Sequence, residues 1–189
     1  MSYHLTRRSF LQGVGASSLV IPTAAAVQPA LAGAQDIARE NSLPGTRDWL
    51  LSNTRIDPKT RYRCPWIEGY CSHTSLRAGD TLQFFVSTNP VSEFTLDISR
   101  LGYYGGAGGR LMKRIGPLEG ERQADPEVGG KRLRDCQWQA SAELEIPGNW
   151  VSGVYIGKLT AEQENIQSYT IFIVRDDREA DLLLSLIHI

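Results

Sequence analysis

The sequence has few of the side chains that bind metals or act as nucleophiles. It holds three cysteines, three histidines and two methionines in 189 residues. No Cys-x-x-Cys and no histidine pair at ligand spacing occurs, so the sequence predicts no metal site in this chain. No Gly-x-Ser-x-Gly motif is present either, and no Ser/His/Asp set can be assigned. The residues therefore indicate no catalytic group.

Neither sign of charge is in excess. Lysine and arginine total 20 and aspartate and glutamate total 21, which gives a formal net charge of −1. Nucleic-acid binding needs a basic field, so this balance excludes nucleic acid as a partner. A composition of 41% hydrophobic and 22% charged residues is that of a globular domain and excludes a multi-span membrane protein.

The amino terminus has the features of an export signal. Arg7 and Arg8 are followed by Phe10 and Leu11, and the stretch from Ser9 to Gln35 carries no charge. This pattern resembles a twin-arginine signal, which directs a folded protein across a bacterial membrane. We therefore expect the twin-arginine export machinery as a partner, membrane contact only during export, and a periplasmic or secreted location.

The same segment offers a place for its own removal. Ala30 and Ala32 supply the small residues that a signal peptidase needs, which makes residues 1–32 the signal. The alternative is a membrane anchor that is never cleaved. Pro22 and Pro29 disfavour a stable spanning helix, and so favour cleavage.

Glycine and proline are plentiful, with 18 and 9 residues, and period-two alternation follows a polar lead-in. Residues 33–65 read as an irregular lead-in, with one helical turn near residues 46–51 that Thr46 could cap. Residues 66–178 read as a sandwich domain, because apolar side chains recur at every second position. Strands are expected at residues 66–70, 81–88, 94–100, 111–115, 142–146, 153–160 and 167–175.

The clearest alternation lies in residues 94–100, with Phe94, Leu96 and Ile98 on one face. One apolar and one polar face are typical of an antiparallel strand. The last run, residues 167–175, is apolar on both faces, so we expect it to lie centrally in its sheet. Together these strands predict an all-β fold, an antiparallel two-sheet β-sandwich of immunoglobulin-like type.

A glycine-rich segment, residues 102–109, contains the pair Tyr103 and Tyr104. A phosphate-binding loop would need a Gly-Lys-Ser/Thr ending and a following helix, and neither is present. We therefore interpret the segment as a wide turn whose glycines adopt positive φ. The two tyrosines could stack on a sugar or another flat ligand, or could pack over the edge of the sandwich.

The cysteines leave alternatives open. Cys64 and Cys71 are close enough in sequence to form a disulfide in an oxidising compartment. Cys136 precedes Gln137-Trp138 at a spacing that suits a half-buried strand, where a thiol behaves as a small hydrophobic side chain. A catalytic pairing of Cys71 or Cys136 with His73 is the alternative to these structural roles.

Several stretches together resemble one family, the large (beta) subunit of N,N-dimethylformamidase and its relatives, from about Glu40 to Leu183. They are Glu40-Asn41-Ser42-Leu43-Pro44-Gly45-Thr46, Ile67-Glu68-Gly69-Tyr70, Phe85-Val86-Ser87-Thr88, Arg100-Leu101-Gly102-Tyr103-Tyr104-Gly105-Gly106, Trp150-Val151-Ser152-Gly153-Val154-Tyr155 and Ile171-Phe172-Ile173-Val174-Arg175-Asp176-Asp177. The resemblance implies an exported relative of an amide C–N hydrolase, of which this chain is the N-terminal sandwich portion.

The resemblance also implies what lies outside this chain. In the family, the sandwich precedes a larger domain similar to glutamine amidotransferases, where two tyrosines and a glutamate hold a mononuclear iron. No residue here matches those ligands by position, so we expect no cofactor in this chain and the missing C-terminal domain as its partner. Residues 179–184 look like the start of that domain, and residues 185–189 resemble translated sequencing-adapter read-through.

Three functions follow from the sequence. The first is a non-catalytic sandwich domain of an exported amide hydrolase, which supports an active site built downstream. The second is an extracytoplasmic binding module that takes a carbohydrate or similar ligand through Tyr103 and Tyr104. The third is an enzyme in its own right, with His73 acting on a thiol.

Overall fold

The computed structural model describes residues 36–60 and 63–178. The expected signal residues Arg7, Arg8, Phe10, Leu11, Ala30 and Ala32 lie outside this part of the chain. So do residues 179–189, for which a following domain and an adapter sequence were expected. Within the described residues, no helix is long and apolar enough to cross a membrane.

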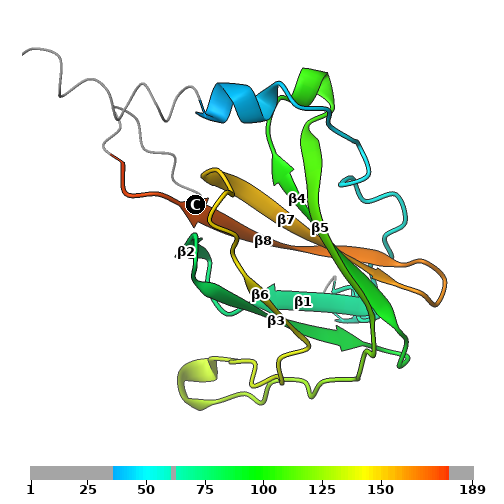
Figure 1. Cartoon of the computed structure of the whole chain (residues 1–189). Helices are drawn as coiled ribbons and strands as arrows, with labels where there is room; N and C mark the ends of the chain where they lie inside the picture. The colour runs from blue at the N-terminus through cyan, green and yellow to red at the C-terminus, as the bar shows by residue number, and fades with distance from the viewer. Residues whose placement is uncertain (1–35, 61–62, 179–189) are drawn as a thin grey trace, which may run out of the picture.

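The fold is the predicted all-β sandwich of two sheets (Figure 1). One sheet has three strands in the order β1-β3-β6, and the other has five in the order β2-β8-β7-β4-β5. The strands are β1 (Ile67–Cys71), β2 (Ser75–Arg77), β3 (Thr81–Thr88), β4 (Phe94–Leu101), β5 (Gly109–Leu118), β6 (Ala142–Glu145), β7 (Gly153–Ala161) and β8 (Gln167–Arg175).

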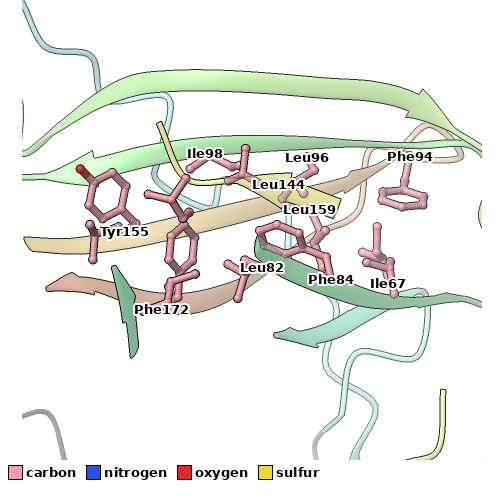
Figure 2. Packing of buried hydrophobic residues seen from close by; sticks show 14 of the residues in the cluster. Ile67, Leu82, Phe84, Phe94, Leu96, Ile98, Leu144, Tyr155, Leu159 and Phe172 are labelled. Atoms are coloured by element: carbon pink, nitrogen blue, oxygen red, sulfur yellow. The ribbon is translucent and has the colours of Figure 1, made fainter. Parts of the chain in front are cut away.

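The core lies between the sheets, where the period-two alternation predicted it. Phe94, Leu96 and Ile98 of β4 are fully buried. They face apolar side chains of the opposite sheet, and Phe84 meets Phe172 edge to face with ring centroids 6.0 Å apart (Figure 2). Burial of such side chains stabilises a sandwich by roughly 1.5–3 kcal/mol each.

Strand β8 is an inner strand of the five-stranded sheet, as expected, although it is not the middle one. It lies between β7 and the three-residue β2, whose pairing with it is parallel, so the sandwich is not wholly antiparallel. On the outward face of β8, Tyr169 and Ile171 are 48% and 46% exposed. Strand β2 went unpredicted because three residues are too few for alternation to show.

The lead-in is less irregular than its composition indicates. Residues 36–41 form a short helix, and Thr46 makes a β-bridge with Gly109 at the start of β5. The expected helical turn at residues 46–51 is a set of turns, in which Thr46 Oγ1 accepts a hydrogen bond from the Asp48 amide. The lead-in therefore packs along the five-stranded sheet (Figure 1).

The connection from β5 to β6, residues 119–141, covers the outer face of the three-stranded sheet. Cys136 and Trp138 lie in this connection, which has no strand, so the strand expected there is wrong. The Tyr70 ring stacks on Phe85 at 4.8 Å and meets Trp138 at 5.4 Å. Its hydroxyl donates a hydrogen bond to the Cys136 carbonyl. These side-chain contacts hold the middle of the connection, and backbone hydrogen bonds from Thr88 to Glu121 and from Ser141 to Phe84 hold its two ends against β3.

Candidate functional site

The two adjacent tyrosines of the glycine-rich segment have opposite environments. Tyr103 is 70% exposed, whereas Tyr104 is 3% exposed. Tyr104 adopts φ 42°, and Gly105, Gly106 and Gly108 also have positive φ, so the segment is the wide turn that was expected. The turn directs Tyr104 into the molecule, and its ring is not available to stack on a ligand. Only Tyr103 retains that possibility.

Tyr104 belongs to a buried polar cluster at one end of the sandwich, which we call the polar junction: Glu40, Arg100, Tyr104 and Arg110. Arg100 takes the inward position after Ile98 in β4 and is 4% exposed. In the ladder it lies directly opposite Arg110 of β5. Two like charges at such a position repel each other unless an anion compensates them.

Glu40, from the helix at residues 36–41, supplies that anion. Arg110 donates to both Glu40 carboxylate oxygens, from Nε at 2.8 Å and from Nη2 at 3.1 Å. The Tyr104 hydroxyl donates to Glu40 Oε1 at 2.9 Å and accepts from Arg100 Nη1 at 3.0 Å. The carboxylate therefore compensates one guanidinium directly and the other through a phenol. Paired and hydrogen-bonded charges of this kind are the form in which proteins bury ions.

Three of the stretches that carry the family resemblance meet at the polar junction. Gly45 and Gly102 lie so close to Tyr104 that a Cβ on either would collide with its side chain. The Ser152 carbonyl accepts from Arg100 Nη2 at 3.0 Å, and Gly153 packs against the guanidinium. Trp150 stacks on Tyr155 at 4.9 Å, as core residues. The most specific motifs of the chain are thus used to build one junction.

The electrostatics of the polar junction follow from these contacts. Burial by itself raises the pKa of Glu40, but hydrogen bonds from Arg110 and Tyr104 outweigh it and hold the pKa below 4.5. Burial raises the pKa of Tyr104, although its hydrogen bond from Arg100 opposes the change. At neutral pH, Glu40 is therefore an anion and Tyr104 a neutral phenol.

A tyrosine beside a glutamate invites comparison with the iron ligands that the resemblance implies. The junction does not fit a cation, because Arg100 and Arg110 already donate to the phenol and the carboxylate. Among the described residues, no group of three or more histidine, cysteine, aspartate or glutamate side chains could hold a metal ion. We therefore assign no metal role to Glu40 or Tyr104.

The three cysteines are free thiols. Cys71 Sγ donates to Thr170 Oγ1 at 3.2 Å, and burial raises the pKa of Cys71 to about 11. Burial also raises the pKa of Cys136. His73 is exposed, and its Nδ1 lies 3.0 Å from Ser72 Oγ. Raised thiol pKa values disfavour the thiolate that nucleophilic catalysis needs, so the proposed Cys–His pairing lacks support.

Two of the hollows on the surface lie beside residues already described. One, of about 710 Å³, adjoins the polar junction and is lined by Glu40, Arg110 and three further arginines; we call it the arginine cavity. The other, of about 590 Å³, lies between β1 and the 119–141 connection, beside Tyr70 and Trp138. Sequence reasoning found neither. The sequence does hold one indication of the polar junction beside the arginine cavity. Arg100 puts a cation at an inward position of a strand whose other inward residues are apolar.

Comparison with protein families adds to this geometry. Residues 95–188 match the model of a family described as N,N-dimethylformamidase beta subunit-like, C-terminal. This part of the chain is similar to that family. The match begins at the second residue of β4 and includes Arg100, Tyr104 and Arg110 of the polar junction. Comparisons with curated proteins and with solved structures give no match.

Proposed function

We propose that this chain provides a non-catalytic β-sandwich domain of an exported, dimethylformamidase-like amide hydrolase. In this proposal the reaction takes place in a following domain, which would also hold the iron. The observation that carries the proposal is the polar junction: the polar groups of the dimethylformamidase-like motifs are hydrogen-bonded to one another inside the fold.

Such a junction is suited to a supporting role. Glu40 joins the lead-in to β5 through Arg110, and Asn41 Oδ1 accepts from the Tyr103 amide at 3.2 Å. Lys158 of β7 donates to the Asp48 carbonyl of the same lead-in. These contacts fix the lead-in on the five-stranded sheet and give a rigid body. A rigid support of this kind positions a neighbouring active site, which is the contribution we expect from the domain.

The experiment is to extend the clone past codon 183 and to assay simple formamides with and without added iron. We expect iron-dependent hydrolysis by the extended protein and none by the present chain. The matched variant is Tyr104→Phe in the extended protein, which should lower stability but leave kcat unchanged below the unfolding temperature. Loss of kcat in a folded Tyr104→Phe protein, or no hydrolysis by the extended protein, would overturn the proposal.

Export is the second part of the proposal and is tested separately. Fusion of residues 1–35 to a reporter that must fold before export should deliver the reporter to the periplasm. The double substitution Arg7→Lys with Arg8→Lys should retain it inside the cell, because the twin-arginine pair is the address that the machinery reads. The control substitution Gln12→Asn leaves both arginines in place and should not prevent export of the reporter. Equal export of all three fusions would contradict a twin-arginine signal.

One observation favours a second function, a ligand-binding module. Tyr103 is 70% exposed, so much of its ring is accessible to a ligand. Carbohydrate-binding sites use such rings. Saturable quenching of tryptophan fluorescence by sugars, abolished by Tyr103→Ala and retained in Tyr169→Ala, would establish this function. Absence of saturable quenching in the unsubstituted chain would exclude it.

A further inference from the structure

The arginine cavity is lined by more cationic than anionic side chains. Four arginines line it, Arg39, Arg110, Arg175 and Arg178, together with the acids Asp36, Glu40 and Asp176. The chain as a whole carries a net charge of −1, so this hollow departs from the average surface. The four guanidinium groups outnumber the three carboxylates, and a concave site with an excess of one sign of charge attracts ions of the opposite sign.

Two of the three acids are already paired. Glu40 accepts from Arg110 and Tyr104, and Asp176 accepts from Arg178 Nε at 2.8 Å. Burial raises the pKa of Asp176, but its hydrogen bonds from Arg178 and Ser152 hold it below its ordinary value, so it remains an anion committed to its pair. The third acid, Asp36, lies at the exposed edge of the cavity.

The arginines, by contrast, retain unused donors. Arg110 donates from Nε and Nη2 to Glu40, and it pairs with no second acid among the described residues. Arg39 makes no ion pair with any residue that the structure describes. Arg175 lies 3.6 Å from Asp177, a carboxylate that Arg77 approaches more closely, at 3.0 Å. Guanidinium groups bind carboxylates through paired N–H donors, so these three side chains have the chemistry to hold one more carboxylate.

The other residues that line the cavity indicate which chemical group would be attached to the carboxylate. Trp150 and Val174 are 9% and 2% exposed, and both line the cavity with Met112 and Leu43. Asn149 and Gly148 also line the cavity and bring polar groups to it. Ligand sites typically combine an apolar lining with a few polar groups that fix orientation. A carboxylate attached to a short apolar group matches both parts of this lining.

We propose that the arginine cavity binds a carboxylate that carries a small apolar group, held by Arg39, Arg110 and Arg175 over Trp150. This site is distinct from the exposed Tyr103, and it needs no catalytic step. It does not rest on the proposed function, because it uses only residues of this chain.

The test uses the full chain and two probes of the same shape, sodium butyrate and butyramide, in isothermal titration calorimetry. Butyrate should bind saturably with a Kd of about 1 mM, and neutral butyramide should not bind. The Nε–Hε signals of the cavity arginines should shift in NMR spectra with butyrate alone. Failure of butyrate to saturate, or equal binding of both probes, would overturn the proposal.

The variants are chosen outside the polar junction so that they fold. Arg39→Gln with Arg175→Gln should weaken butyrate binding by about tenfold, since each removes a charge-assisted donor. The matched control, Arg47→Gln with Arg132→Gln, removes two exposed arginines that do not line the cavity and should leave Kd unchanged. Equal binding by the two double variants, with unchanged circular dichroism, would contradict the site.

The carboxylate could also come from the chain itself, because Glu179 follows Arg178 directly and Asp181 comes two residues after Glu179. Glu179→Gln with Asp181→Asn separates the two sources. Tighter butyrate binding in that variant identifies a competing carboxylate from the chain, and unchanged binding identifies a free ligand. Both results require a carboxylate-binding cavity, whereas loss of binding in that variant would contradict it.

Discussion

The same pair of strands carries arginine in two different settings. Near the middle of the β4–β5 ladder, Arg114 lies opposite Asp97 and donates to it at 2.6 Å, with its side chain 62% exposed. At the end of the ladder, Arg100 lies opposite Arg110 and is 4% exposed. The first pair is complete within the sheet. The second needs Glu40, which comes from outside the sheet.

This difference shows what each arrangement contributes. An ion pair with one partner in water, as Arg114 is, is worth about 0–1 kcal/mol, because water screens the exposed charge. A buried pair that loses one partner leaves a charge without compensation, at a cost of about 3–5 kcal/mol. The polar junction therefore makes the stability of the sandwich depend on the lead-in. The pair of Asp97 and Arg114 lies within the sheet and does not involve the lead-in.

The largest expected effect is that of Glu40→Ala. Removal of the carboxylate leaves Arg100 and Arg110 facing each other, so we expect a loss of about 3 kcal/mol in the free energy of unfolding. The matched control is Asp97→Ala, where we expect about 0.5 kcal/mol or less. Urea denaturation followed by tryptophan fluorescence measures both. Similar losses in the two variants would remove the distinction between the regions.

Acidification tests the same contrast without removing a side chain. The pKa of Glu40 is lowered in the folded protein, so the unfolded chain takes up more protons as the pH falls below 4.5. The stability that Glu40 contributes is present above that pH and decreases as the pH falls through the folded pKa. The difference in unfolding free energy between the unsubstituted chain and Glu40→Gln should therefore shrink from pH 6 to about pH 3. A constant difference would contradict a lowered pKa for Glu40.

The smallest of these effects is expected for Tyr104→Phe. The substitution keeps the buried ring and removes one hydroxyl that joins Arg100 to Glu40, at a cost of about 1 to 2 kcal/mol. Tyr103→Phe, at an exposed position, should change stability by less than about 0.5 kcal/mol. A thermal unfolding comparison checks both. Equal melting temperatures would show that the hydroxyl of Tyr104 adds nothing to the junction.

The strands could be read from the sequence because burial on one face leaves a local pattern. Residues 81–88 were expected as a strand and form β3, and Phe94, Leu96 and Ile98 face the core. The residues of a strand do not indicate which strands will lie beside it in the sheet. Strand β8 has two apolar faces, yet Tyr169 and Ile171 remain about half exposed, because they point to the outer face of the sheet, away from the core.

The candidate site was less predictable for the same reason. Tyr103 and Tyr104 are identical in type and adjacent, and only the positive φ of Tyr104 separates an exposed ring from a buried one. Glu40 and Arg110 are 70 residues apart in sequence. Nothing near either residue indicates that they form a pair. The one local signal was Arg100, where a charge interrupts the inward series of β4.

A double-mutant cycle on Glu40 and Arg110, run beside one on Asp97 and Arg114, tests the structural role of the polar junction most directly. The cycle isolates the pairwise free energy from the separate cost of each truncation. We expect a coupling of about 2 kcal/mol for the buried pair and about 0.5 kcal/mol or less for the exposed pair. Equal coupling energies would contradict the central claim that a buried charge cluster joins the lead-in to the sandwich.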